Sequence, residues 1–342
     1  MDTQPSLDEW RRLYEAAIAF KEARPWEWMT EAHLFGVRNP ETKEIGYGSI
    51  MGMRGEHFAL AVYLGSEGLD GFWRMETLQE PDPAFLLEIP LLQASFEDRR
   101  ELRRQDLQVI KSLGLKFRGR KAWPLFRSYV PGYFPWFLTA EEARFLTLAL
   151  QQALEVALRV REDPALLDPL QEGLYLVRTP ERRGEALAWK DEWMRPTPPE
   201  ARPSPPPIEE AELAAMRAQL PRRPIGLEVD LFIMPVYVRD KDDPRPYFPY
   251  ILLTVESKSG FVLGSELLAP KPSLDAVWAK APERFVDALR RLGVIPAKIF
   301  VARERVWRLL EPVATALGIR LVQARSLPAL ERARAFLEQG MT

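Results

Sequence analysis

Basic side chains are concentrated in one stretch of this 342-residue sequence, between Arg99 and Arg127. Only two acids, Glu101 and Asp106, lie there, although the whole chain is nearly neutral, with 47 basic and 49 acidic residues. A local excess of Lys and Arg attracts phosphates, so nucleic acid is the candidate partner. The ten basic residues are Arg99, Arg100, Arg103, Arg104, Lys111, Lys116, Arg118, Arg120, Lys121 and Arg127.

Aromatic residues accompany the end of this stretch and continue beyond it. A basic surface beside exposed rings holds single-stranded nucleic acid through phosphate attraction and base stacking. The alternative is that Arg99–Arg104 form a solvated helix face and that the rings belong to the core. The rings are Trp123, Phe126, Tyr129, Tyr133, Phe134, Trp136 and Phe137. The candidate nucleic-acid-binding residues are Arg99, Arg100, Arg103, Arg104, Lys116, Arg118, Arg120 and Lys121.

Several catalytic and metal-binding classes are excluded by residue content. The sequence has no cysteine, which removes disulfides, thiolate zinc sites and thiol nucleophiles. His33 and His57 are the only two histidines, so a histidine-rich metal site is excluded. The sequence contains no GxGxxG, no P-loop motif and no GxSxG elbow.

One acidic cluster, Asp240, Asp242 and Asp243, lies in the segment RDKDDPRP. Calcium needs six to eight oxygen ligands, and neighbouring Arg239, Lys241 and Arg245 neutralise the cluster, which favours a solvated hairpin loop. His33 and His57 flank a predicted strand, and surface or cap positions are the favoured interpretation for both. We therefore predict no resident metal or cofactor.

The composition predicts a soluble cytoplasmic protein with two domains. Apolar residues make up 46% of the chain, which suffices for a sizeable core. No apolar run reaches membrane-spanning length, and the acidic, polar N-terminus does not resemble a secretory signal. Residues 195–207 (RPTPPEARPSPPP) include seven prolines and predict an extended linker. We expect one domain over residues 1–194 and a second over residues 208–342.

The first domain is predicted to be α+β with an antiparallel sheet. Ser6 and Glu9 have capping-box spacing at the start of a helix that ends near Arg24. Phe85–Gln93, interrupted by Pro90, resembles an edge strand. Further helices are expected over Asp106–Leu113 and Thr139–Val160, and further strands over Gly46–Met53, Phe58–Leu64, Tyr175–Val177 and Ala186–Trp189.

The second domain is predicted to be α/β with a mixed sheet. Lys258-Ser259-Gly260 indicates a tight hairpin between two strands, and Gly293 and Gly318 indicate helix ends. The expected order is βββαβαβα over Glu228–Val238, Pro249–Ser257, Phe261–Leu268, Leu274–Leu292, Lys298–Ala302, Arg303–Leu317, Arg320–Val322 and Leu327–Gln339.

That element order resembles the ribonuclease-H-like fold of ribonuclease H, integrases and transposases. The segment YILLTVESKSGFVLGSELL resembles the second and third strands of integrase cores, and KIFVARERV resembles the fourth strand and its exit loop. The whole chain also resembles an uncharacterised bacterial two-domain family of domains of unknown function. Its first domain carries WPLFRSYVPGYFPWFLTAEEARFL.

The ribonuclease-H resemblance implies a carboxylate set that holds two divalent metals, Mg²⁺ or Mn²⁺. Asp230 matches the first acid, in the middle of the first strand, with Glu228 facing the same way. The second position matches Ala302 and Arg303, with Glu304 just beyond, and Glu331 is the candidate for the third. Glu256 is a further candidate ligand. An arginine at the second position puts a positive charge where a cation belongs.

The sequence therefore favours a non-catalytic binding or adaptor protein with a degenerate ribonuclease-H-like domain and nucleic acid as its leading partner. One alternative is a metal-dependent nuclease that uses Asp230, Glu304 and Glu331. The other is a structural module that binds a protein partner or forms a homo-oligomer through an apolar interface.

Overall fold

The computed structural model describes residues 4–77, 83–169, 171–184, 186–199, 208–241 and 243–339. The chain divides into two compact units. Unit 1 comprises residues 1–130 and 135–200, and unit 2 comprises residues 131–134 and 201–342. Residues 195–199 of the expected linker form neither helix nor strand, and its residues 200–207 lie outside the described residues. Within the described parts of the chain, every helix is too short or too polar to cross a membrane.

Unit 1 is built on a seven-stranded sheet in the order β5-β4-β3-β2-β1-β6-β7. Neighbouring strands are antiparallel except β1 and β6, which run parallel, so the sheet is mixed and the expectation of an antiparallel sheet is corrected. A parallel pair is possible because a long connection, which runs from β2 to α4, separates β1 from β6, whereas a hairpin would make them antiparallel. The strands are β1 (Phe35–Arg38), β2 (Ile45–Met51), β3 (Ala59–Leu64), β4 (Leu91–Glu97), β5 (Trp123–Tyr129), β6 (Tyr175–Arg183) and β7 (Ala186–Met194).

The expected edge strand over Phe85–Gln93 is wrong in its residue range and in its place within the sheet. A short 3-10 helix, η2 (Pro83–Glu88), comes first, and β4 then lies between β3 and β5 in the interior of the sheet. Pro90 precedes β4, so its missing N–H leaves the ladder intact. Its carbonyl still accepts a hydrogen bond from the Leu64 N–H at 2.9 Å.

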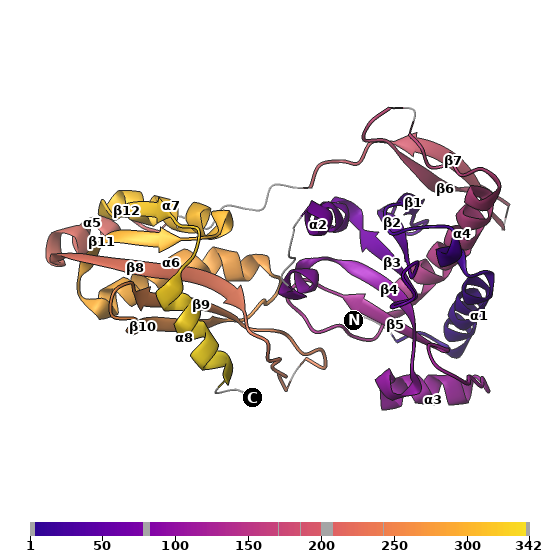
Figure 1. Ribbon diagram of the computed structural model, residues 1–342, viewed down its shortest axis with the longest axis horizontal. Helices are drawn as coiled ribbons and strands as arrows, with labels where there is room; N and C mark the ends of the chain where they lie inside the picture. The colour runs from indigo at the N-terminus through magenta and orange to yellow at the C-terminus, as the bar shows by residue number, and fades with distance from the viewer. Residues whose placement is uncertain are drawn as a thin grey trace. The chain divides into compact units, whose positions relative to one another are not determined.

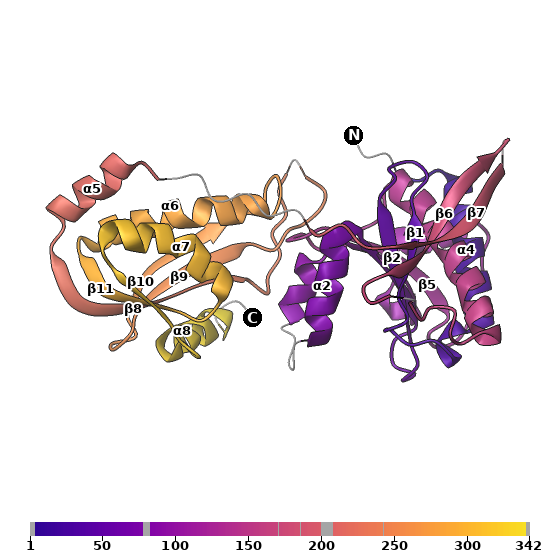
Figure 2. The ribbon, with the colours of Figure 1, turned by 90° about the horizontal axis from the view of Figure 1, so that it is seen from above.

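Helices cover both faces of this sheet (Figures 1 and 2). On one face, α1 (Leu7–Ala23) and α4 (Ala140–Glu162) pack over alternate strand residues such as Leu92 and Phe96. On the other face, α2 (Gly65–Thr77) buries Phe72 against Tyr63 and Leu91. Leu91 and Leu92 are neighbours in β4 but belong to different cores, because successive side chains of a strand point to opposite faces of the sheet.

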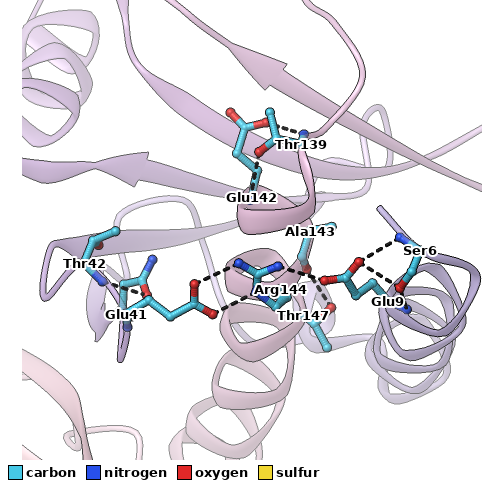
Figure 3. Close-up of polar contacts among 10 residues, drawn as sticks. Ser6, Glu9, Glu41, Thr42, Thr139, Glu142, Ala143, Arg144 and Thr147 are labelled. Atoms are coloured by element: carbon cyan, nitrogen blue, oxygen red, sulfur yellow. Dashed lines mark hydrogen bonds and ion pairs between the residues drawn. The ribbon is translucent and has the colours of Figure 1, made fainter. Parts of the chain in front are cut away.

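Two capping boxes start the helices α1 and α4 (Figure 3), and the first of them is the one predicted from the spacing of Ser6 and Glu9. The Glu9 N–H donates to the Ser6 Oγ at 3.3 Å, and the Glu142 N–H donates to the Thr139 Oγ1 at 3.2 Å. Each glutamate carboxylate in turn accepts a hydrogen bond from the backbone N–H of its cap residue. These contacts satisfy amides that the helices cannot pair internally.

Unit 2 contains a five-stranded mixed sheet in the order β10-β9-β8-β11-β12. Strand β9 pairs antiparallel with both β8 and β10, and β11 pairs in parallel with both β8 and β12. The expected order of strands and helices is confirmed, with α5 (Glu210–Gln219) as an addition before it. The elements are β8 (Arg222–Ile233), β9 (Tyr250–Glu256), β10 (Val262–Leu268), α6 (Asp275–Leu292), β11 (Ile295–Val301), α7 (Glu304–Leu317), β12 (Arg320–Gln323) and α8 (Pro328–Gln339).

The helices of unit 2 are divided between the two faces of its sheet (Figure 2). Helix α8 packs on the face that carries Phe232 and Leu253, with Leu330 inserted between helix and sheet. Helices α6 and α7 cover the opposite face, where Leu227 and Leu231 are buried. Glu228 and Asp230 share the parity of Phe232, so they belong to the face covered by α8.

Residues 131–134 belong to unit 2 although they lie between β5 and α4 in sequence. The Phe134 N–H donates to the Pro246 carbonyl, and the Phe248 N–H donates to the Gly132 carbonyl, both at 2.9 Å. The Phe134 ring stacks on Phe248 with centroids 5.6 Å apart. Gly132 has φ of 82°, and a Cβ there would lie 2.7 Å from the Pro270 side chain, so glycine is required.

Candidate functional site

The basic stretch of unit 1 forms a short 3-10 helix, η3 (Arg99–Glu101), then α3 (Arg104–Ser112) and a loop that leads into β5. The Asp106 carboxylate accepts the Arg103 N–H at 2.8 Å and so starts α3. Gly114, with φ of 70°, ends it. Figure 1 shows α3 at the margin of unit 1.

Seven basic side chains of this stretch are exposed, and we call them the basic surface. The exposed acid in this fully described stretch is Glu101, which pairs with Arg100 at 3.1 Å. Of the other sequence candidates, Arg103 and Lys121 are half-buried. The basic surface consists of Arg99, Arg100, Arg104, Lys111, Lys116, Arg118 and Arg120.

Arg127 does not belong to the basic surface, because it is buried and paired. Its guanidinium makes two hydrogen bonds to the Asp106 carboxylate, at 2.7 and 2.9 Å, and one to the Phe126 carbonyl at 2.7 Å. Both charged side chains are 9% exposed. The pair joins α3 to β5 and removes one cation and one acid from the surface charge.

The loop that carries Lys116, Arg118 and Arg120 is anchored at its end by Lys121. The Lys121 N–H donates to the Asp98 carboxylate at 2.8 Å, and its ammonium lies 3.2 Å from the Glu97 carboxylate. The same Glu97 lies 3.4 Å from the His57 imidazole. These contacts are absent from the sequence prediction, since nothing in the spacing of residues 57, 97 and 121 indicates proximity.

A hydrogen-bonded chain continues from His57 along the sheet. The Tyr129 hydroxyl donates to the Gln93 side-chain oxygen at 3.2 Å, and the Gln93 amide nitrogen lies 3.3 Å from His57 Nε2. This arrangement fits a neutral imidazole with its proton on Nδ1, toward Glu97. Burial is the main cause that lowers the pKa of His57, and the nearby Glu97 opposes it.

The aromatic residues that follow the basic stretch are divided among several environments. All seven rings are buried or half-buried. Phe126 packs in the core edge-on to Tyr14, with centroids 5.0 Å apart, whereas Tyr133 and Phe134 belong to unit 2. Trp123 lies under Arg99 and Trp136 under Arg103. The alternative interpretation, in which these rings belong to the protein interior, accounts for most of them.

Two carboxylates of unit 2 are used to cap α8. The Glu228 Oε2 accepts the Leu330 N–H at 2.8 Å, and Glu228 is 6% exposed. The Glu331 Oε1 accepts the Leu327 N–H at 3.1 Å. Acids at a helix N-terminus satisfy unpaired amides and complement the helix dipole. Glu331, the candidate third acid, therefore already has a structural partner.

Asp230 lies in the middle of β8 beside an arginine from the neighbouring loop. Arg303 Nε is 3.5 Å from Asp230 Oδ2, and Asp230 Oδ1 accepts the Leu231 N–H at 2.9 Å. The Asp230 side chain is 10% exposed and that of Arg303 is 44% exposed. Arg303, which lies between β11 and α7, thus presents its charge to the carboxylate of the first candidate acid.

The remaining candidate ligands make separate contacts. Glu304 is exposed and pairs with Arg308 on its own helix at 2.5 Å. Glu256 accepts amides from the turn after β9, and its bonds to Ser259 lower its pKa. Among the residues that the structure describes, no group of three or more His, Asp or Glu side chains is arranged to hold a metal ion.

The acidic loop of unit 2 contacts a basic residue from outside the loop. The Lys271 ammonium bonds the Asp240 carboxylate and lies 3.7 Å from that of Asp243. Asp242 lies outside the described residues. In unit 1, His33 accepts the Thr30 N–H at 3.0 Å, a local turn contact separate from the His57 chain.

Comparison with known proteins gives two domain matches. Residues 10–178 match the model of a domain of unknown function, DUF7309, and residues 212–338 match that of another, DUF6930. No curated protein matches the chain. One solved structure with local similarity is the simian T-cell lymphotropic virus intasome in complex with PP2A regulatory subunit B56 gamma. It is 17% identical, with a TM-score of 0.26, and the match covers 35% of this chain and 40% of that chain. The two domain matches fit an uncharacterised two-domain family.

Proposed function

We propose that the protein is a non-catalytic adaptor that binds nucleic acid through the basic surface of unit 1. The observation that carries this proposal is the exposure of seven cations between Arg99 and Arg120 with a single exposed acid among them. Such a density of exposed positive charge favours a polyanion, since each neutralised phosphate releases a counterion. A formal net charge of −2 means that the rest of the molecule does not share this attraction.

The proposal assigns unit 2 a ribonuclease-H-like fold that serves as a scaffold. Three antiparallel strands followed by two parallel additions, in the order β10-β9-β8-β11-β12, support that fold. The placement of Arg303 beside Asp230 supports the loss of metal chemistry, because a guanidinium already balances the carboxylate that would hold a cation. The capping roles of Glu228 and Glu331 support it further.

A second candidate function is self-association through unit 2, and the edge strand β10 favours it. Leu267 is 68% exposed and Val262 is 41% exposed on this strand, which has a free edge in the described sheet. An exposed apolar edge is a template for pairing with the same strand of a second copy. Leu267→Glu should convert a dimer to a monomer in light scattering, and a monomeric wild-type protein would rule out this candidate.

Fluorescence anisotropy with labelled oligonucleotides tests the main proposal. The test variant is the triple change Lys116→Gln, Arg118→Gln, Arg120→Gln. The matched control neutralises three exposed arginines elsewhere in unit 1, Arg12→Gln, Arg54→Gln, Arg182→Gln. Binding by the wild type should weaken steeply between about 50 mM and about 200 mM salt, and the test variant should lower the salt slope by roughly 2–3.

The control variant should retain the wild-type slope. Equal losses in the two triple variants would show that binding follows net charge rather than this surface. Absence of salt-dependent binding to any oligonucleotide would remove the proposed function altogether.

A further inference from the structure

We infer that the nucleic acid held by the basic surface is double-stranded rather than single-stranded. This inference rests on the proposed function and narrows it. Single-strand binders combine cations with open aromatic faces on which bases stack, whereas duplexes keep their bases stacked inside and present phosphates. Whether the faces of the aromatic rings beside the basic surface are open or covered therefore distinguishes the two ligands.

The Trp123 ring is already covered. The Arg99 guanidinium lies over it at 5.8 Å, and the Phe117 ring packs against it with centroids 5.7 Å apart. Trp123 is half-buried as a result. A base that stacks on the face under Arg99 would have to displace an arginine that itself belongs to the basic surface, which argues against the indole as a platform.

The Trp136 and Phe137 rings are covered in the same way. The Arg103 guanidinium lies 5.3 Å from the Trp136 centroid and 5.9 Å from that of Phe137. The guanidinium of the buried Arg127 also lies over the Phe137 ring, 4.9 Å from its centroid. The two rings also meet edge to face, with centroids 5.1 Å apart. Arginine thus covers the aromatic rings nearest the basic surface.

The basic surface carries its cations on a helix and on a loop whose end is anchored. Arg104 and Lys111 are both exposed on α3 and seven residues apart, which corresponds to about 10 Å along the helix axis. The loop of Lys116, Arg118 and Arg120 is held at Lys121 by Asp98 and Glu97. A backbone that the fold already holds needs little ordering on binding a rigid ligand, which suits a duplex.

Charge density then decides between the two ligands. A duplex carries one phosphate charge per about 1.7 Å of axis, and each of its strands carries one per about 3.4 Å. A surface that gains energy only from phosphates therefore favours the duplex, and unstacked bases add nothing to its affinity. The same reasoning makes binding largely independent of base sequence.

The experiment compares a duplex of about 20 base pairs with each of its two unpaired strands, by anisotropy of the full-length protein at about 50 mM salt. The expected result is binding of the duplex at least about tenfold more tightly than either strand, with a steeper salt dependence. A second measurement uses Arg99→Ala, which uncovers the Trp123 indole, and Arg100→Ala as its control. Both variants lose one exposed cation, but only Arg99 covers a ring.

Arg99→Ala should raise single-strand affinity relative to duplex affinity, and Arg100→Ala should leave that ratio at the wild-type value. Equal or tighter binding of the single strands, abolished by the triple change at residues 116, 118 and 120, would overturn this inference and leave the proposed function standing. Absence of salt-dependent binding to both ligands would overturn the two together.

Discussion

Arg303 Nε lies 3.5 Å from Asp230 Oδ2, on the face of the unit 2 sheet that α8 covers. Asp230 lies in β8, and Arg303 is the residue before α7, just beyond the end of β11; the two meet because β8 and β11 pair in parallel. Where a metal-dependent nuclease would need a second acid, a guanidinium supplies positive charge to the first. The negative charge of Asp230 is thus balanced by the Arg303 guanidinium.

Replacing that arginine with an acid should create divalent-cation binding. Arg303→Asp places a second carboxylate beside Asp230, and carboxylate oxygens are the ligands that Mn²⁺ and Mg²⁺ prefer. We expect Mn²⁺ binding by electron paramagnetic resonance in this variant, and loss of that binding when Asp230→Asn is added. Arg308→Asp on the exposed side of α7 is the control for charge and should not bind.

Wild-type protein that binds Mn²⁺ and cleaves an oligonucleotide, with both properties lost in Asp230→Asn, would contradict the prediction. That outcome would instead support the nuclease alternative with Asp230, Glu304 and Glu331.

Local signals predicted most of the elements correctly. The two capping boxes start α1 and α4, and glycines at positive φ end α6 and α7, at Gly293 and Gly318. Each of these signals depends on residues within one helical turn, where backbone conformation and side-chain type are directly linked. The order of elements in unit 2 follows from such signals, because its strands and helices alternate with clear boundaries.

The sequence analysis did not predict helix α2, because glycines inside it lower its helix propensity. Gly68 and Gly71 lower helix propensity, but both are required by close packing. A Cβ at Gly68 would lie 2.7 Å from the Tyr63 backbone, and one at Gly71 would lie 2.8 Å from the Ile89 side chain. The tertiary contact that makes this helix stable is therefore the one that makes its sequence look unsuited to a helix.

Pairings between distant residues could not be predicted either. The parallel pair of β1 and β6 joins Gly36 to Val177, and the buried bond of Arg127 to Asp106 looks in sequence like two more surface charges. The spacing of residues along the chain gives no information about such contacts. The basic stretch was recognised correctly as a local excess, while the partners of Lys121 and Arg127 required the fold.

Breaking the buried pair of Arg127 and Asp106 should destabilise unit 1 strongly. Arg127→Met leaves a buried carboxylate without its bidentate partner, and the expected loss is about 3–5 kcal/mol in the free energy of unfolding. Chemical denaturation followed by circular dichroism measures it. The double variant Arg127→Met, Asp106→Leu should recover much of the loss, because it removes both charges, and a double variant as unstable as the single one would contradict this account.

Arg144 joins three segments of unit 1, and its removal should weaken the protein at neutral pH but not in acid. Its guanidinium makes two hydrogen bonds to Glu41, at 2.8 and 2.9 Å, and one to Glu9 at 2.8 Å (Figure 3). These bonds hold the pKa of both carboxyls below the usual value of 4.5. Their contribution is therefore present above pH 4.5 and is lost as the pH falls through the lowered values.

Because Arg144 and Glu41 are partly exposed, Arg144→Gln should cost only about 0.5–1 kcal/mol at pH 7. Urea unfolding at pH 7 and at pH 3 measures the difference, which should shrink toward zero at the lower pH. Arg11→Gln, at an exposed pair with Asp8 within α1, is the control and should have a smaller effect at pH 7. An Arg144→Gln effect that is equal at both pH values would show that packing, not charge, is responsible.

His57 should make the free energy of unfolding depend on pH below its usual pKa of 6.5. Burial lowers its pKa below the usual 6.5, so the unfolded chain takes up a proton at a higher pH than the folded one. The contribution of the neutral imidazole is present above pH 6.5 and is lost as the pH falls from there through the folded-state pKa. His57→Gln should flatten the slope of unfolding free energy over this range, whereas His33→Gln, which leaves the Glu97 contact in place, should retain it. Since the chain has two histidines, their imidazole resonances can be assigned with these two variants, and a His57 resonance that titrates at or above 6.5 would exclude this origin of the pH dependence.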